Sequence, residues 1–297
     1  MEFIKYSKIF FLISSVLIIG SLVFLAIWGL NLGIEFTGGS ILEINYQERP
    51  LNKTIESELS ELGLGHVYIQ PIGDQAVILR MKDINESTHQ KILSSLRKER
   101  NIEELRFESI GPVIGKELKD KTIITIILAL ISILLYVAIS FRKVRPPLKS
   151  WQYGVVAILA LFHDVLIPLG IFAILGKFYG VQMTIPIVVA LLTIFGYSIN
   201  DTVVIFDRIR ENLSRRREIL FEEIVNQSIN ESFTRSVNTS FTTLLILISI
   251  FFLGGDSLKY FSLALIIGIL AGTYSSLFLA SPLLVVWKRR IENKYLK

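Results

Sequence analysis

The sequence predicts an α-helical membrane protein with six transmembrane helices and one extracytoplasmic α+β domain between helices 1 and 2. Three observations support this fold class: six long apolar segments, one continuous polar block, and an intermediate composition. Of the 297 residues, 52% are hydrophobic and 19% are charged, whereas charged residues make up about 25% of a soluble protein. The average is too apolar for a globule and too charged for membrane helices throughout. The chain therefore combines apolar spans with a water-facing part.

Six segments are long and apolar enough to cross a bilayer, whose hydrocarbon core requires roughly 20 residues of helix. The first, residues 9–30, carries no charge and follows Lys5 and Lys8, an arrangement that resembles a signal peptide. Its apolar run is too long and no small-residue cleavage site follows, so we expect an uncleaved anchor. The other five segments follow the polar block and comprise residues 122–141, 153–175, 183–206, 237–253 and 260–287.

Basic residues near the span ends predict the orientation. If the N-terminus is cytoplasmic, the loop 142–149 holds four basic residues and no acid, and the tail opens with three basic residues at 288–290. The two short loops on the other side hold one each, Lys177 and Lys259. The loop after the fourth span and the start of the fifth hold Arg208, Arg210, Arg215, Arg216, Arg217 and Arg235. This positive-inside bias predicts that both termini are cytoplasmic. Topology thus explains the net charge of +5, and nucleic acid is not expected as a partner.

The polar block has the rhythm of a small α+β domain. Strands are predicted by alternation in residues 41–46, 66–70, 76–80 and 102–107. Helices are predicted in residues 52–62 and 85–98, with Asn52 and Asn85 as their N-caps. The order βαββαβ is that of a ferredoxin-like split unit.

The predicted organisation has four parts. They are the N-terminal tail with the first helix (residues 1–30), the extracytoplasmic ferredoxin-like domain (31–120), helices 2 to 6 (121–287) and a basic cytoplasmic tail (288–297).

Ionisable residues inside the predicted spans are the candidate functional residues, since Asp at a helix centre costs about 2.5–3.5 kcal/mol or more. Asp164 lies near the middle of the third span, next to His163. It is either a proton-relay or helix-locking carboxylate, or a structural group bonded to a neighbouring hydroxyl or backbone atom. The residues alone leave both interpretations open.

A second set lies where the fourth span ends and the fifth begins. Two stripes at helical spacing are formed by Tyr197, Ser198, Asp201 and Arg208, and by Arg235, Asn238, Thr239 and Thr242. Because the two spans are antiparallel, we expect Arg235 at the depth of Asp201. The alternative for Arg235 is a basic residue that snorkels to the interface.

An acid and a base at one depth in apolar surroundings predict a proton-coupling site formed by Asp201 and Arg235. Arginine stays charged and favours ionised Asp201, whereas desolvation favours the protonated acid. A helix shift that changes the distance between the two groups would therefore change proton affinity and couple it to conformation.

Other chemistries find no support in the sequence. The absence of cysteine excludes disulfides, thiolate metal sites and cysteine nucleophiles. Three scattered histidines do not predict a metal cluster, and no phosphate loop, nucleophile elbow or HExxH motif occurs. Asp164 and Asp201 lack the motifs of an intramembrane aspartyl protease. We therefore expect no enzyme activity, no cofactor and no metal.

Four segments resemble the SecF members of the SecD/SecF family of protein-export membrane proteins. They are residues 33–39, 110–118, 162–165 (Phe-His-Asp-Val) and 196–212, which contains Asn200-Asp201-Thr202. The polar block of about 90 residues is typical of SecF, because SecD carries the larger extracytoplasmic insertion, and the chain is too short to be a fused SecDF with about twelve spans.

The resemblance implies a subunit of the bacterial cytoplasmic (inner) membrane that pairs with SecD, in a complex similar to proton-driven exporters of the resistance-nodulation-division type. It implies association with the SecYEG channel and use of the proton gradient to pull the translocating preprotein outward. In the family, the acid of the Asn-Asp-Thr motif and an arginine in the next span take part in proton transport, which implies Asp201 and Arg235 here. Asn200, His163 and Asp164 are carried over as relay or structural residues.

Two other functions remain open on the sequence. The chain could be a passive assembly partner whose polar residues only hold helices to SecD. It could also be half of a proton-driven exporter of small molecules or lipids. Lipid is expected as a partner in every case, because the spans face the membrane.

Overall fold

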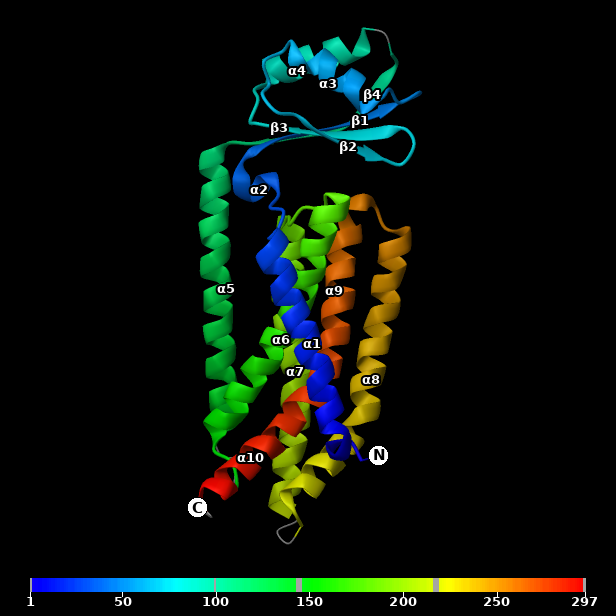
Figure 1. Cartoon of the computed structure of the whole chain (residues 1–297). Coiled ribbons are helices and arrows are strands. Elements are labelled where there is room, and N and C mark those ends of the chain that lie inside the picture. Colours follow the sequence, from blue (N-terminus) through cyan, green and yellow to red (C-terminus); the bar gives the residue numbers. More distant parts are fainter. Residues whose placement is uncertain (1, 99, 143–145, 216–218, 296–297) are drawn as a thin grey trace. The chain divides into compact units, whose positions relative to one another are not determined.

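The computed structural model describes residues 2–98, 100–142, 146–215 and 219–295 (Figure 1). Four basic residues used for the orientation, Lys143, Arg145, Arg216 and Arg217, lie outside these ranges. The chain forms two compact units. The first comprises Met1–Leu30, Ile126–Tyr179 and Ile185–Lys297, and the second comprises Asn31–Thr125 and Gly180–Thr184.

Six helical segments of the described chain are long and apolar enough to cross a membrane, which confirms the predicted number of spans. The first five are α1 (Ser7–Trp28), α5 (Pro112–Ser140), α6 (Ser150–Tyr179), α7 (Ile185–Arg215) and α8 (Phe221–Leu253). The sixth is built from α9 (Asp256–Ser275), the π-helical turn η2 (Ser276–Ala280) and α10 (Ser281–Tyr295). A short 3-10 turn, η1 (Ile4–Tyr6), precedes α1.

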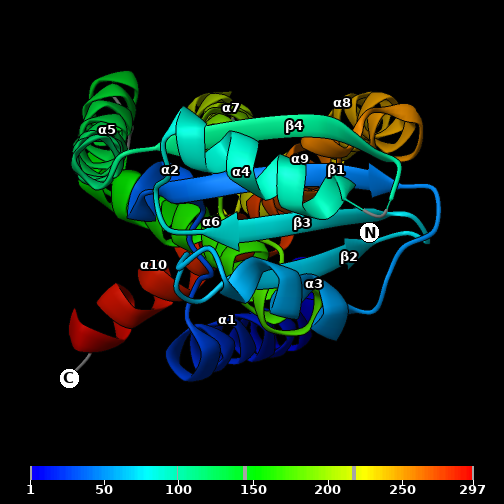
Figure 2. The same ribbon diagram turned by 90° about the horizontal axis from the view of Figure 1, so that it is seen from above.

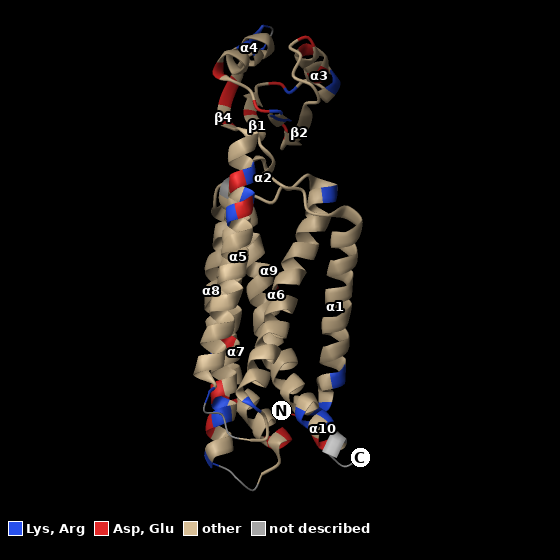
Figure 3. Cartoon of the chain, turned by 90° about the vertical axis from the view of Figure 1, so that its left-hand side faces the viewer, with Lys and Arg blue, Asp and Glu red and all other residues tan. Residues whose placement is uncertain are grey.

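The helices extend further than the apolar segments. Helix α5 begins at Pro112 rather than at residue 122, and α8 begins at Phe221 rather than at residue 237. The added turns carry charged residues, which a hydropathy pattern does not count as part of a span. Figure 3 shows the result as long uncharged stretches in α1 and α5 with charged residues toward the helix ends.

Burial separates the helices of the first unit into two groups. The apolar window of α6 is 61% buried, whereas that of α5 is only 6% buried and that of α1 only 11%. Helices α6, α7 and α9 therefore form the interior of the unit, and α1 packs against α6. The exposed apolar faces of α1 and α5 suit contact with lipid or with another membrane protein.

Two glycines allow close helix packing inside this unit. A Cβ atom added to Gly170 of α6 would lie 2.6 Å from the Cα of Ser21 in α1. A Cβ added to Gly268 of α9 would overlap the side chain of Ile194 in α7. Gly268 and Gly272 stand four residues apart in α9, a spacing of small residues that permits close approach of membrane helices.

The second unit contains a four-stranded antiparallel sheet of order β2-β3-β1-β4. Its strands are β1 (Gly39–Tyr46), β2 (Tyr68–Ile72), β3 (Ala76–Met81) and β4 (Ile102–Ile110). Its helices are α2 (Ile34–Thr37), α3 (Asn52–Ser60) and α4 (Glu86–Arg97). Figures 1 and 2 show α3 and α4 on the same face of the sheet. Strand β3 lies between β1 and β2, which is the split βαββαβ arrangement that the sequence predicts.

One predicted helix cap is right and the other is wrong. The side chain of Asn85 accepts a hydrogen bond from the Thr88 backbone N–H, so Asn85 is the N-cap of α4. Asn52 is instead the first residue of α3, and Leu51 occupies the N-cap position. The Leu51 carbonyl accepts the backbone N–H groups of Thr54 and Ile55 without help from a side chain.

Alternate residues of the strands and the inner faces of α3 and α4 form the core of this unit. Leu42 pairs with Leu79 and Ile44 with Val77 across β1 and β3, and all four are fully buried. Tyr46 is buried with them at 1% exposure, and its hydroxyl has no hydrogen-bond partner among the described residues. Burial, with the nearby Glu58 charge, raises the pKa of Tyr46 from 10.0 to about 12.

Replacing Tyr46 by phenylalanine is expected to increase the free energy of unfolding by about 1 kcal/mol, because an unsatisfied buried polar group is removed. The raised pKa adds a second signature. Stability that is present below about pH 10 should decline in the wild type as the pH rises toward about 12, and the variant should lack this decline. Unfolding of the full chain at neutral and alkaline pH measures both effects. Tyr68→Phe, at an exposed tyrosine, is the control; a less stable Tyr46→Phe protein would contradict the prediction.

Candidate functional site in the membrane helices

Asp201 of α7 is held by serine hydroxyls from two other helical elements. Its Oδ1 accepts a hydrogen bond from Ser236 Oγ of α8 at 2.5 Å. Its Oδ2 accepts one from Ser276 Oγ of η2. The carboxyl group, which is half-buried, thus joins α7, α8 and η2 at one point.

Asp164 of α6 is fully buried, as is the neighbouring His163. Its Oδ1 lies 2.8 Å from His163 Nδ1. Its Oδ2 accepts hydrogen bonds from Ser198 Oγ of α7 at 2.5 Å and from Ser275 Oγ of α9 at 2.7 Å. These contacts are those expected of a carboxylate bonded to neighbouring hydroxyls, and they join α6 to both α7 and α9.

Gly272 lets α9 approach this cluster. A Cβ at residue 272 would lie 3.2 Å from the Ser198 Cβ and 3.5 Å from Asp164 Oδ2. A Cβ would therefore crowd Ser198 but lie in ordinary contact with Asp164, so the glycine lets α9 lie close to α7 at Ser198.

Arg235 and Asn200 are exposed, and the charge of Arg235 acts on Asp201 without a direct ion pair between the described atoms. Ser236 contacts Asp201, so α8 brings Arg235 to the same part of α7, but the Arg235 side chain is exposed. Within the described ranges no ion pair joins Arg235 to Asp201. Arg235 shares its exposed face of α8 with Asn238, Thr239 and Thr242, and Asn200 is exposed on α7. The stripe expected from the sequence is present, but it points outward.

Serines of α8 are the site residues that the sequence analysis missed. Four of them are buried at a spacing of four residues: Ser228, Ser232, Ser236 and Ser240. Ser240 accepts a hydrogen bond from Tyr197 Oη at 3.0 Å and lies 2.5 Å from Thr273 Oγ1 of α9. The i, i+4 spacing places the four on one helix face, and this repeat was the available signal.

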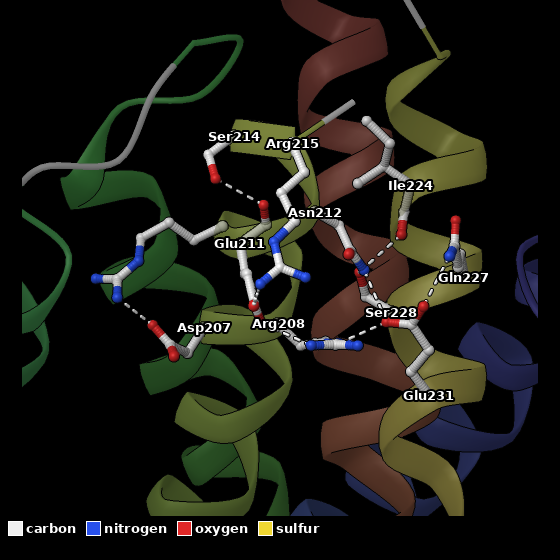
Figure 4. A network of polar contacts seen from close by, with 11 residues as sticks. Asp207, Arg208, Glu211, Asn212, Ser214, Arg215, Ile224, Gln227, Ser228 and Glu231 are labelled. Atoms are coloured by element: carbon white, nitrogen blue, oxygen red, sulfur yellow. Dashed lines mark hydrogen bonds and ion pairs between the residues drawn. The ribbon is translucent and has the colours of Figure 1, made fainter. Parts of the chain in front are cut away.

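A separate ionic network holds the end of α7 to the start of α8 (Figure 4). Glu231 of α8 accepts hydrogen bonds from Arg208 Nε at 2.5 Å, Asn212 Nδ2 at 2.9 Å and Gln227 Nε2 at 2.7 Å. Arg208 also bonds Glu211 at 2.6 Å. Arg208 therefore belongs to this ionic network, about two turns of α7 from Asp201, and is not part of the Asp201 site.

The fold and these contacts define a class: a multi-pass membrane protein with an inserted ferredoxin-like domain and with carboxyl groups held by hydroxyls between its helices. Residues 89–290 match the model of the family described as "Protein export membrane protein SecD/SecF, C-terminal", and residues 23–48 match the SecD/SecF GG motif. The chain belongs to the SecD/SecF family of protein-export membrane proteins.

Its relatives show which of the two subunits of that family the chain resembles. The chain is 42% identical to the protein translocase subunit SecF of Thermobaculum terrenum, covering 99% of this chain and 94% of the relative. It is 38% identical to SecF of Desulfurispirillum indicum, over 96% of this chain and 91% of the relative. The crystal structure of SecDF from Thermus thermophilus, described as a translocon-associated membrane protein, matches 97% of the chain with a TM-score of 0.85 and 34% identity. The chain spans 39% of that SecDF chain.

Proposed function

We propose that this chain pairs with SecD and that the pair uses the proton gradient across the bacterial cytoplasmic membrane to assist preprotein translocation through the SecYEG channel. The observation that carries the proposal is the bonding of Asp201. Its described hydrogen-bond partners are two serine hydroxyls. An arginine in direct contact would hold the carboxylate ionised, whereas hydroxyls can serve either protonation state. Asp201 is therefore suited to take up and release a proton.

The proposed orientation places both termini in the cytoplasm and the domain of residues 31–120 outside. Lys288, Arg289 and Arg290 of α10 and Arg142 after α5 support it, because basic residues concentrate on the cytoplasmic side. The outside domain is then available to the translocating preprotein or to SecD.

The exposed polar face of α8 supports the pairing with SecD. A charged or amide side chain facing lipid tails is costly, and Arg235 and Asn238 are both exposed on this face. A SecD partner would cover them and place Arg235 beside a shared proton path. Exposed apolar faces such as that of α5 are left for lipid.

Reconstitution tests the proposal directly. Vesicles containing SecYEG, SecD and this chain should export a preprotein faster when a proton gradient, acidic on the preprotein-receiving side, is imposed. A protonophore should remove the stimulation, and vesicles without this chain should not show it. Equal export with and without the gradient, in vesicles that recover SecD normally, would refute proton-driven function.

A passive assembly function is the second candidate, because every bond of Asp164 and Asp201 also joins neighbouring helices or residues. It predicts that substitutions at these acids lower SecD recovery together with export.

Arg235→Ala is expected to reduce gradient-dependent export by about tenfold or more, the order of a typical coupling free energy of 1–3 kcal/mol. The free energy of unfolding of the chain alone should change by less than about 0.5 kcal/mol, because substitutions of exposed residues outside the core and its hydrogen-bond networks have little effect on stability. Export and unfolding are measured on the same preparation, with Arg290→Ala in α10 as an exposed-arginine control. Normal export by Arg235→Ala would remove the arginine from the mechanism.

A further inference from the structure

Two successive serines connect the two carboxyl groups of the membrane helices. Ser275 Oγ donates to Asp164 Oδ2 at 2.7 Å, and Ser276 Oγ donates to Asp201 Oδ2. Neighbouring residues of a helix point about 100° apart. The junction between α9 and η2 therefore reaches an acid of α6 with one hydroxyl and an acid of α7 with the next.

Each of these hydroxyls has a second acceptor within reach. Ser276 Oγ lies 3.1 Å from the Thr273 carbonyl oxygen, and Ser275 Oγ lies 3.2 Å from the Gly272 carbonyl oxygen. A serine hydroxyl has one hydrogen and two lone pairs. It donates to an ionised carboxylate; when that group is protonated, it accepts the new O–H and turns its own hydrogen to the carbonyl. Both protonation states of a buried acid are then fully hydrogen-bonded, which avoids the penalty of an unsatisfied polar group.

The charged and titratable surroundings of the two acids are few. His163 Nδ1 contacts Asp164, while His163 Nε2 is buried without a hydrogen-bond partner among the described residues. Tyr274 of α9 lies against the His163 ring at 6.0 Å between centroids. Arg235 of α8 is exposed, and its charge acts on Asp201, as does that of Asp164.

We propose that Asp164 is a second proton-holding carboxyl group, coupled to Asp201 through Ser275 and Ser276, which the π turn η2 positions. The inference rests on the proposed proton-driven function and names further residues of the same site. A proton from water adds to Oδ2 of one aspartate, forming a carboxyl O–H, and leaves by breaking that bond. No bond to a serine oxygen breaks. The two serines hold the carboxyl groups in fixed positions. Because like charges held near each other in a low dielectric disfavour each other, protonation of one acid favours ionisation of the other.

Infrared difference titration of the complex of this chain with SecD in vesicles tests the coupling, because it observes protonated carboxyl groups directly. Asp164→Asn and Asp201→Asn assign the two bands. The titration midpoint of Asp201 should move by about one pH unit or more when Asp164 is replaced, a tenfold change in proton affinity. In the Ser275→Ala/Ser276→Ala variant, Asp164→Asn should shift the Asp201 midpoint by less than it does in the wild type. In the Ser276→Thr variant, which keeps a hydroxyl, the shift should be as large as in the wild type.

Ser262→Ala is the matched control. Ser262 is also a buried serine of α9, but its described hydroxyl bonds go only to the Leu258 and Lys259 carbonyls of its own helix. In the Ser262→Ala variant, Asp164 and Asp201 should titrate as they do in the wild type. An Asp201 midpoint that is the same with and without the Asp164 carboxyl, or a double serine variant that retains the full shift, would overturn the inference.

Proton flux in the same vesicles distinguishes failure of this inference from failure of the proposed proton-driven function. If Asp201→Asn abolishes flux but the titration shows no coupling, only the inference fails. If the titrations of Asp164 and Asp201 are coupled but the gradient never stimulates export, the proposed function fails and the inferred coupling of the two acids remains valid.

Discussion

Replacing Asp201 by asparagine abolishes gradient-dependent export and leaves recovery of SecD unchanged, if the carboxyl group works by exchanging a proton. Asparagine has nearly the same shape, and its Oδ1 can still accept from Ser236 Oγ, as the carboxylate does at 2.5 Å. Its amide can donate to Ser276 Oγ, whose hydrogen then turns to the Thr273 carbonyl 3.1 Å away. The helix contacts therefore survive, while the group that binds a proton is lost. Export should fall to the level measured without a gradient, at least about tenfold.

Asp207→Asn is the control for this substitution. Asp207 lies six residues further along α7, is exposed, and pairs with Arg210, a type of surface ion pair that contributes about 0–1 kcal/mol. Export should be unaffected by it. Loss of SecD recovery with Asp201→Asn would favour a structural function for the acid, and unimpaired export with normal recovery would exclude Asp201 from the mechanism.

The largest expected effect on stability is that of Gly170→Ala. The new Cβ would lie 2.6 Å from both the Cα and the Cβ of Ser21. A backbone atom cannot rotate aside, so α1 must move away from α6. Overpacking of this kind typically costs about 1–3 kcal/mol. Ser21 is one of the buried residues of α1, so the change falls on the face by which α1 packs against α6.

Unfolding of the full chain in detergent measures the change, and Gly20→Ala provides the comparison. Gly20 lies in α1 itself, one residue before Ser21, and a Cβ there meets nothing within 4 Å. Its replacement should be neutral or stabilising, since alanine favours helix over glycine by about 1 kcal/mol. Equal stability of the two variants would show that α1 is free to shift at Gly170.

The number of spans and the βαββαβ order were predictable because each rests on a pattern along the chain. An uncharged run as long as residues 9–30 predicts a span, and alternation in residues 41–46 predicts a half-buried strand. Helix ends were less predictable. The extra turns of α5 from Pro112 and of α8 from Phe221 are polar, so they carry no apolar signal.

The candidate acids were visible in the sequence, whereas their partners were not. A carboxylate in an apolar run, such as Asp164 or Asp201, is conspicuous because it is costly there. A serine in a membrane helix can bond its own backbone, so Ser275 and Ser276 look ordinary until the fold shows what they face. The direction of Arg235 was also inaccessible, since spacing gives the depth of a residue but not which helix face meets a neighbour.

The π turn η2 fixes the rotational phase between the two ends of the sixth span. A π turn holds roughly one residue more than an α turn, so the residues after Ala280 are set about 100° behind where an unbroken helix would put them. In this phase Arg289 of α10 pairs with Glu222 of α8, and Trp287 lies 5.3 Å from Trp151 between ring centroids. A straightening of the turn would rotate α10 out of both contacts or carry Ser276 away from Asp201. The hydrogen bonding of Asp201 and the packing of α10 are therefore linked through the one extra residue of the π turn.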